Sequence, residues 1–476
     1  MNFLGSKSGL YTDFYELSMA QGYFYSGKKD EHAVFDYHFR NNPFDSGYTI
    51  FAGLCDLLAL LEQYSFDEKS IDYLKEQGFK DEFLDYLKNF TFNGDVISFK
   101  EGEIVFPNEP VIRIEGSIIE TQLVETILLN IINFQSLIAT KASRIRAVAG
   151  ERLFVDFGLR RAQGFGGIHA SKAAVLGGAD ATSNVYAGYR YHLPVSGTQA
   201  HSWIQSFEDE LEAFRAYARN ATGKIILLVD TYDTLNSGIP HAIKIAKELK
   251  QQGKELTAVR LDSGDLAYLS KKARKMLDKE GLHDVKIIAS NQLDEFLIRS
   301  LDQQNAPIDG YGIGTQLITG LKSAALDGVY KLTELNKKPR LKLSENIEKI
   351  PLPGSKNVYR VFDTEGYFYA DAVALGDEPD HEINAIHHPN YISKGFKIGN
   401  KKTELLSKMV MQNGQRINEP DEVGKIKEYM ASRLAGLSEE YKRFENPHIY
   451  KVGVTKKLFD LRQSMIDELR NNGNND

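Results

Sequence analysis

Apolar and polar residues follow one repeated order through the middle of the chain. A short apolar run, often rich in β-branched residues, leads into a polar cluster and then into a stretch with helical spacing. Runs of this kind occur at 153–157, 225–229, 256–259 and 285–289. A short apolar run bounded by polar turns is typical of a strand buried on both faces of a parallel sheet. The pattern therefore predicts strand and helix units from about residue 152 to residue 326.

Polar residues follow each predicted strand where it ends. Asp230 and Asp233 follow the second run, Asp262 and Asp265 the third, and the glycine-rich stretch 309–315 closes the series. Loops at the carboxyl edge of a β/α barrel or open α/β sheet meet at one mouth, so we expect these residues to gather there. Their carboxylates suit ribose hydroxyls or the water ligands of Mg²⁺. Capping of the following helix is an equal alternative for Asp233 and Asp265.

The two ends of the chain have a different pattern. Residues 32–40 alternate between apolar and polar side chains, which predicts a half-buried antiparallel strand. Residues 121–149 are too long for one comfortable helix, so we expect a break near Phe134 or Ser136. Helical patterns are also predicted at 50–64, 69–77 and 81–89, and strands at 330–343, 359–363 and 367–373. We expect the late strands to rejoin the early ones.

Composition and charge exclude several classes of protein. With 476 residues the chain is expected to form two or three domains. Apolar residues make up 42% and charged residues 26% of the chain, which is ordinary for a globular protein and argues against general disorder. The formal net charge of −7 gives no reason to expect general binding to nucleic acid or to anionic membranes.

Cysteine content and the apolar runs bear on the compartment. Cys55 is the only cysteine, which excludes an internal disulfide and a zinc cluster built on cysteines. The first ten residues lack the apolar core of a signal peptide, and we expect no apolar run of membrane-spanning length. These features predict a cytoplasmic protein.

The segment 195–204 is the strongest single clue to chemistry. It holds the only tryptophan, Trp203, two residues after His201, and the small hydroxyl residues around this histidine can contact a phosphate or orient the imidazole. Taken alone, a histidine close to an aromatic residue is more often a packed core residue than a catalyst. Its place among the polar clusters at strand ends favours the chemical interpretation.

Two other sets of residues suit anions. Gly312, Gly314 and Thr315 allow backbone N–H groups to approach a phosphate, although a tight turn is the ordinary alternative. Arg160, Arg161 and Arg260 can clamp a carboxylate or phosphate through paired N–H donors. Surface salt bridges are the alternative for these arginines.

Taken together and in order, these segments resemble the nicotinate phosphoribosyltransferases. The matching segments are 11–20, 35–40, 156–161, 178–184, 197–203, 229–234, 260–265, 311–315, and 342–344 with 353–354. No single motif is decisive, but together they span nearly the whole chain in the order of the family.

The resemblance implies a fold and an activity. The fold is α/β: an irregular β/α barrel of the type II phosphoribosyltransferases over residues 137–339, with an α+β domain formed from residues 1–136 and 340–476. The activity is that of an ATP-dependent ligase of NAD biosynthesis, which converts nicotinate and phosphoribosyl pyrophosphate to nicotinate mononucleotide and pyrophosphate. Mg²⁺ and ATP are the implied cofactor and co-substrate, and a homodimer with shared active sites is the implied assembly.

The resemblance also implies roles for individual residues. Phe157 and a Tyr15 donated by the other subunit sandwich the nicotinate ring, and His201 is phosphorylated by ATP. Arg260 addresses the pyridine carboxylate or the nearby ribose, while Asp230 and Asp262 serve the ribose hydroxyls and the Mg²⁺ pyrophosphate, the metal being held through water. The 5-phosphate lies against Gly312, Gly314 and Thr315. The remaining substrate-binding positions are Arg160, Asp180, Thr198, Ser263 and Gly264.

Three alternatives stay open at this stage. Nicotinamide phosphoribosyltransferases share the fold and much of the site, and neither Asp180 nor Arg260 decides between a carboxylate and an amide substrate. Quinolinate phosphoribosyltransferases resemble this chain in the barrel only and are shorter. A non-catalytic regulator that binds phosphoribosyl compounds is also compatible with the scaffold, although intact His201 and Arg260 argue against it.

Overall fold

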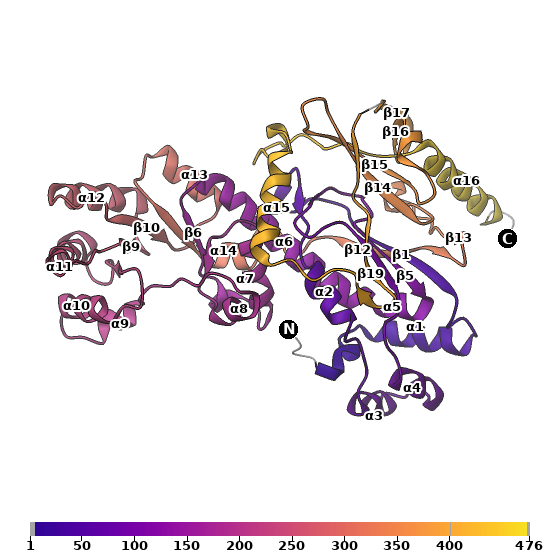
Figure 1. Ribbon diagram of the computed structural model, residues 1–476, viewed down its shortest axis with the longest axis horizontal. Coiled ribbons are helices and arrows are strands. Elements are labelled where there is room, and N and C mark those ends of the chain that lie inside the picture. The colour runs from indigo at the N-terminus through magenta and orange to yellow at the C-terminus, as the bar shows by residue number, and fades with distance from the viewer. Residues whose placement is uncertain (1–4, 400, 474–476) are drawn as a thin grey trace. The chain divides into compact units, whose positions relative to one another are not determined.

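The computed structural model describes residues 5–399 and 401–473, and it divides the chain into two units. One unit comprises residues 138–324, and the other combines residues 1–137 with residues 325–476 (Figure 1). The second boundary lies at 324/325, whereas the predicted domains meet at 339/340. The reason is that β12 (Gly328–Leu335) pairs antiparallel with β1 (His32–Phe39) and thereby belongs to the unit that holds both chain ends.

Six parallel strands form the sheet of the 138–324 unit, in the order β7-β6-β11-β10-β9-β8. They are β6 (Leu153–Asp156), β7 (Ala181–Thr182), β8 (Ile226–Leu228), β9 (Ala258–Leu261), β10 (Lys286–Ser290) and β11 (Gly310–Ile313). The last strand in the chain, β11, pairs with the first, β6, as in a barrel. Within the described residues, the edge strands β7 and β8 do not pair, and this is the pairing that would close the barrel. The predicted irregular β/α barrel is therefore confirmed.

Helices alternate with these strands, and several begin at an aspartate cap. Asp233 accepts hydrogen bonds from the backbone N–H groups of Leu235 and Asn236, and Asp265 accepts one from Tyr268. The capping alternative is thus confirmed for both aspartates. The helical segments are η3 (Leu159–Arg161), α7 (Gly166–Leu176), α8 (Val185–Tyr191), α9 (His201–Gln205), α10 (Glu210–Asn220), the π-helical turn η4 (Thr234–Gly238), α11 (Ile239–Gln251), α12 (Leu266–Lys279), α13 (Glu295–Gln303) and α14 (Thr315–Ile318).

Antiparallel sheets dominate the other unit. The larger has the order β13-β12-β1-β5-β3-β19-β20, so the early strands β1, β5 and β3 lie between late strands. Its remaining strands are β13 (Lys338–Pro339), β5 (Ile112–Ser117), β3 (Asp95–Ser98), β19 (Lys408–Gln412) and β20 (Gln415–Arg416). A second sheet contains β17 (Tyr391–Lys397), β16 (Ala385–His388), β21 (Val452–Val454), β15 (Phe368–Leu375), β14 (Lys356–Phe362) and β18 (Thr403–Leu405), while β2 (Thr49–Ile50) pairs with β4 (Ile104–Val105). The expectation that late strands rejoin early ones is thus confirmed for β12, whereas the predicted strands at 359–363 and 367–373 belong to the second sheet, which contains late strands only.

The helices of this unit confirm three predicted segments. They are η1 (Gly5–Leu10), α1 (Phe14–Tyr25), η2 (Pro43–Asp45), α2 (Leu54–Leu61), α3 (Glu68–Glu76), α4 (Asp81–Lys88), α5 (Ile118–Leu123), α6 (Glu125–Ala149), η5 (Ile347–Lys349), η6 (Asp380–Glu382), α15 (Val423–Ala435), η7 (Glu439–Tyr441) and α16 (Lys456–Gly473). The predicted helices at 50–64, 69–77 and 81–89 correspond to α2, α3 and α4. In Figure 1, α1 and α5 lie beside the sheet that contains β1 and β5.

Two predictions about this unit are wrong. Strand β1 is buried on both faces, because Asp36 on its polar face forms an ion pair of 2.8 Å with the buried Lys356. The helix break lies at Val124, and α6 continues through Phe134 and Ser136. Ser136 is accommodated in the helix because its hydroxyl bonds the backbone N–H and C=O of Ala52.

The expectation about apolar runs also needs correction. Residues 118–149 form one stretch that is long and apolar enough, by length and composition, to cross a membrane. In the structure 67% of its most apolar window is buried inside the protein. Burial of this extent is typical of a helix in the core of a protein.

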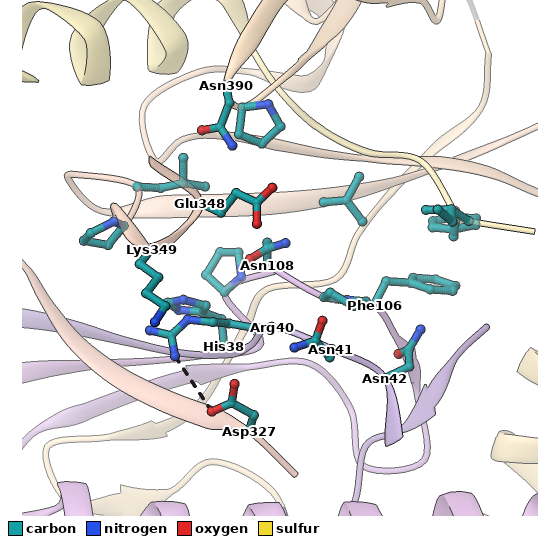
Figure 2. Close-up of a pocket in the computed structure, with 18 of the residues that line it drawn as sticks. His38, Arg40, Asn41, Asn42, Phe106, Asn108, Asp327, Glu348, Lys349 and Asn390 are labelled. Atoms are coloured by element: carbon teal, nitrogen blue, oxygen red, sulfur yellow. Dashed lines mark ion pairs between the residues drawn. The ribbon is translucent and has the colours of Figure 1, made fainter. Parts of the chain in front are cut away.

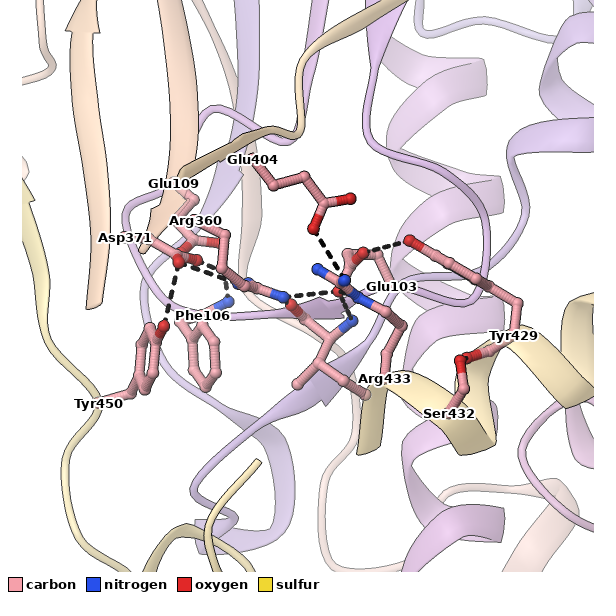
Figure 3. A network of polar contacts seen from close by, with 11 residues as sticks. Glu103, Phe106, Glu109, Arg360, Asp371, Glu404, Tyr429, Ser432, Arg433 and Tyr450 are labelled. Carbon is pink, nitrogen blue, oxygen red and sulfur yellow. Dashed lines mark hydrogen bonds and ion pairs between the residues drawn. The ribbon is translucent and has the colours of Figure 1, made fainter. Parts of the chain in front are cut away.

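A buried network of charges crosses the unit that holds both chain ends (Figure 3). The Arg360 guanidinium on β14 donates to both carboxylate oxygens of Asp371 on β15, at 2.9 and 2.6 Å, and to Glu103 at 2.6 Å. Arg433 of α15 binds the same Glu103 oxygen at 2.8 Å. Burial, together with the neighbouring Asp371, raises the pKa of Glu109. Arg360 therefore neutralises carboxylates that no water reaches.

Replacing Arg360 tests how far the fold depends on this network. We expect Arg360→Met to lower the free energy of unfolding by about 3–5 kcal/mol, because it leaves Asp371 without its buried counter-ion. The exposed pair Lys456 and Asp460 supplies the control, and Lys456→Met should cost less than about 1 kcal/mol. Urea denaturation of the purified proteins measures both values. Equal losses in the two variants would contradict the importance assigned to the network.

Candidate active site

Arg260 forms the centre of a polar cluster at the carboxyl ends of the barrel strands. Its Nε donates to the Ser290 hydroxyl at 2.9 Å, and one terminal nitrogen donates to Thr198 Oγ1 at 2.7 Å and to the Gln199 carbonyl at 3.3 Å. The other terminal nitrogen donates to Asp262 Oδ1 at 2.8 Å. The planar fork of donors thus connects β9, the end of β10 and the segment before α9.

Asp262 is held as a carboxylate by these donors. It accepts hydrogen bonds through Oδ1 from Arg260 and from the Ser290 hydroxyl. Burial raises the pKa of Asp262, but the bonds from Ser290 and Arg260 outweigh burial, and the net shift is downward. The carboxylate therefore keeps its charge where a cationic or metal-bound group would benefit from it.

Asp230 supports the same loop and leaves one oxygen free of donors. Its Oδ2 accepts from the backbone N–H of Asp262 and from the Ser263 hydroxyl, both at 2.7 Å. Within the described residues its buried Oδ1 has no hydrogen-bond partner. Gly264 completes the turn with φ of 75°, a left-handed conformation that favours glycine. Ser263 and Gly264 thus shape the loop that carries Asp262, and Asp230 holds this loop from the neighbouring one after β8.

His201 lies at the first position of α9 and faces this cluster. Its Nδ1 is 3.1 Å from the Thr231 hydroxyl, and its Nε2 is 3.7 Å from Asp262 Oδ2. The side chain is 38% exposed, so a ligand can reach it. When the proton is on Nδ1, the Thr231 hydroxyl accepts it in a hydrogen bond and Nε2 keeps a free lone pair beside Asp262. The imidazole is then placed as a nucleophile.

Phe157 forms an apolar wall of the mouth. Its half-buried ring lies so close to Gly312 that a Cβ at Gly312 would be 2.3 Å from Phe157 Cε2. The Arg260 guanidinium is 5.5 Å from the ring centroid. An aromatic ligand stacked on Phe157 would therefore have a guanidinium nearby.

The structure gives Gly312 a reason to be glycine in addition to the predicted one. The prediction places a phosphate against Gly312, and the Phe157 ring occupies the space that a side chain would fill. Gly314 and Thr315 follow β11, and both are only partly buried. They are the more exposed members of the predicted phosphate cradle, and the phosphate contact of all three residues stays a prediction.

Two supporting residues escaped the sequence analysis. Asp156 is fully buried at the end of β6, and its carboxylate accepts from Gly158 N–H at 2.7 Å, Ser171 at 2.8 Å and Thr182 at 2.7 Å. Burial raises its pKa. Ser290 bonds both Arg260 and Asp262. Asp156 and Ser290 both lie at the end of a predicted strand, which was the available signal. A polar residue at a strand end is, however, also typical of an ordinary helix cap, so the sequence did not single them out.

Three predicted residues are not brought into the cluster. Asp180 lies at the amino end of β7, where it accepts from Arg146 at 2.6 Å and from the backbone N–H of Phe154 at 2.8 Å. This is the edge opposite to the mouth, so the substrate-binding role predicted for Asp180 is not supported. Arg160 is exposed in η3 just after β6. Tyr15 belongs to α1 in the other unit, and its predicted role stays a prediction.

A large cavity of about 990 Å³ lies in the unit that holds both chain ends (Figure 2). None of the predicted site residues lines it. Arg40 in its wall faces Asp327 at 3.8 Å, and burial, with the nearby Arg40, Lys356 and Lys331 charges, lowers the pKa of His38 to about 3. Because none of the predicted site residues lines this cavity, we place the candidate active site at the barrel mouth.

Comparisons with known protein families give one consistent result. Residues 10–133 match the N-terminal domain of nicotinate phosphoribosyltransferase, and residues 153–365 match the nicotinate phosphoribosyltransferase family. Residues 355–462 match the C-terminal domain of the same enzyme. The three matches cover both units of the structure.

Individual relatives agree over nearly the whole length. The nicotinate phosphoribosyltransferase of Bacillus subtilis (strain 168) is 41% identical, over 98% of this chain and 97% of its own. That of Caenorhabditis elegans is 36% identical, over 96% and 93%. The crystal structure of human nicotinic acid phosphoribosyltransferase has a TM-score of 0.86 and 29% identity, covering 95% of this chain and 99% of the human one. The chain belongs to the nicotinate phosphoribosyltransferase family.

Proposed function

We propose that the chain joins nicotinate to the phosphoribosyl group of phosphoribosyl pyrophosphate, forming nicotinate mononucleotide and pyrophosphate for NAD biosynthesis. The observation that carries this proposal is the cluster of Arg260, Asp262 and Asp230 beside the Phe157 ring at the barrel mouth. Full-length similarity to nicotinate phosphoribosyltransferases supports the choice of substrates.

The reaction asks mainly for positioning and charge neutralisation. The pyridine nitrogen of nicotinate forms a bond to the anomeric carbon of the ribose while the bond to pyrophosphate breaks, through a transition state with positive charge on the ribose. Phe157 offers a stacking face for the pyridine ring, and Arg260 offers a cation for its carboxylate or the ribose. Asp230 and Asp262 serve the ribose hydroxyls, while Gly314 and Thr315 receive the 5-phosphate.

The two aspartates also fit a magnesium ion carried mainly by substrate and water. Asp230 Oδ1 has no donor among the described residues, and Asp262 Oδ2 has only His201 nearby, at 3.7 Å. Mg²⁺ prefers carboxylate oxygens in small number together with waters and phosphates. The described residues contain no group of three or more acidic, His or Cys side chains that would form a closed metal cage. When bound, Mg²⁺ neutralises the departing pyrophosphate.

We further propose that ATP drives the reaction through a phosphohistidine at His201. Nε2 attacks the γ-phosphorus of ATP, the bond to the bridging oxygen breaks, and ADP leaves. Water later cleaves the N–P bond, which returns the free imidazole and releases phosphate. The exposure of His201 and its place beside Asp262 support this step. While the phosphoryl group is attached, its charge at His201 orders the pyrophosphate site and couples ATP hydrolysis to product formation.

A homodimer with shared sites completes the proposal. Helix α1 exposes Phe14 by 61% and Tyr15 by 47%, although both are large aromatic residues. Neighbouring large aromatic side chains that are exposed to solvent are typical of a surface that binds another protein. We propose that the partner chain covers this face and that Tyr15 then stacks on the nicotinate of the partner's site.

Product analysis tests the proposed function. The purified protein with Mg²⁺, phosphoribosyl pyrophosphate and nicotinate should form nicotinate mononucleotide, and ATP should increase the rate. The measurement is chromatography of the products, with nicotinamide as the alternative base. Product from nicotinamide alone would assign the chain the amide substrate, and no product from either base would favour a non-catalytic regulator.

The role of His201 is tested separately with labelled ATP. We expect His201→Asn to abolish the transfer of ³²P from the γ-position of ATP to the protein and to lower ATP hydrolysis by more than about 100-fold, because the nucleophile is gone. The acid-labile label on the protein and the released phosphate are measured. His283, 70% exposed in the same unit, provides the control His283→Asn. Label retained in the His201 variant would contradict the phosphohistidine.

A further inference from the structure

A buried carboxylate connects two helices behind His201. Glu210, at the start of α10, is only 5% exposed. Its Oε2 accepts hydrogen bonds from the Ser237 hydroxyl and from Nδ1 of His241, the latter at 2.8 Å. Ser237 lies in the π-helical turn η4, and His241 lies in the first turn of α11. One carboxylate thus holds α10 against the turn that follows β8.

The turn η4 is itself pressed against the end of β8. A Cβ at Gly238 would lie 1.8 Å from the carbonyl oxygen of Val229, the residue just before Asp230. Asp233 caps the same turn through the N–H groups of Leu235 and Asn236. Ser237 is therefore in a fixed position relative to the loop that carries Asp230 and Thr231. Whatever binds Ser237 is placed relative to that loop.

On the other side, α10 holds the short helix that presents His201. The indole N–H of Trp203 donates to the Ala213 carbonyl on α10 at 3.1 Å, and the indole ring packs on Tyr217 at a centroid distance of 6.2 Å. Trp203 is two residues after His201 on α9. The contacts therefore form a closed ring. It runs from His201 to Trp203 on the same helix and, through α10, to Glu210. From Glu210 it continues through Ser237 to Thr231, whose hydroxyl contacts His201.

We propose that Glu210 is a positioning residue for His201. By binding Ser237 and His241, its carboxylate sets the distance between α9 and the loop after β8, and with it the place of the imidazole between Thr231 and Asp262. This inference deepens the proposed function, because it matters for activity only if His201 receives a phosphoryl group. A displacement of about 1 Å is enough to slow a group transfer by about 100-fold.

A surface ion pair between the same two helices provides a matched control. Arg215 of α10 and Glu248 of α11 form hydrogen bonds of 2.9 and 2.7 Å, with side chains 39% and 32% exposed. This pair joins the helices away from η4, so it should not affect the imidazole. Glu248→Gln removes its charge and leaves Glu210, Ser237 and Trp203 in place.

The test observes His201 directly and then its reaction. Protein labelled with ¹³C in the histidine rings gives a signal for His201, identified by its loss in His201→Asn. Glu210→Ala should shift this signal and slow ³²P transfer from ATP at least about tenfold. Glu210→Gln keeps an oxygen that accepts from Ser237, so it should restore most of the wild-type behaviour. Glu248→Gln should match the wild type in both measurements.

Ser237→Ala keeps the inference testable if Glu210→Ala does not fold, because it removes the same hydrogen bond from the other side and should shift the His201 signal in the same direction. An unchanged His201 signal in these variants, or an equal shift in Glu248→Gln, would overturn the inference. If the wild type accepts no label from ATP, the ATP coupling fails while the ring signal still decides whether Glu210 positions His201.

Discussion

The barrel mouth depends on one guanidinium with several acceptors. Arg260 binds Ser290, Thr198, the Gln199 carbonyl and Asp262 at the same time, and its side chain is only 12% exposed. An arginine so engaged holds its neighbours in one geometry, because moving any acceptor leaves a buried N–H group without a partner. Asp262 is then oriented toward His201. The loop after β9, which Asp230 supports through the backbone N–H of Asp262, is held in one position. The candidate site is therefore one connected polar unit.

Much of the fold was predictable because the barrel strands carry their own signal. Buried parallel strands must be apolar throughout, so runs such as 225–229 and 256–259 stand out, and the polar residues after them necessarily lie at one edge. That reasoning placed Asp230, Arg260 and Asp262 close together, as the structure has them. Their chemical roles are a different matter, since placement at an edge does not identify a ligand.

What the sequence analysis missed depends on contacts between distant segments. Gly312 was predicted to be glycine for the access it gives to its backbone N–H, and the ring of Phe157, which fills the space of a side chain, is a further reason that the sequence did not reveal. Asp180 lies in a segment that matches the family, but it precedes β7 and therefore lies at the opposite edge with Arg146. Ser136 looks like a helix breaker, and a hydrogen bond to Ala52 makes it compatible with an unbroken α6. The pattern of neighbouring residues along the sequence reveals none of these contacts with distant residues.

A double-mutant cycle across Arg260 tests the connected unit most directly. Thr198 and Ser290 each bind a different nitrogen of the guanidinium, so Thr198→Val, Ser290→Ala and the double variant are compared by kcat/KM for nicotinate. If Arg260 couples them, the combined effect departs from the sum of the single effects by about 0.5–3 kcal/mol. Effects that add within about 0.5 kcal/mol would contradict the account, because the two contacts would then act independently.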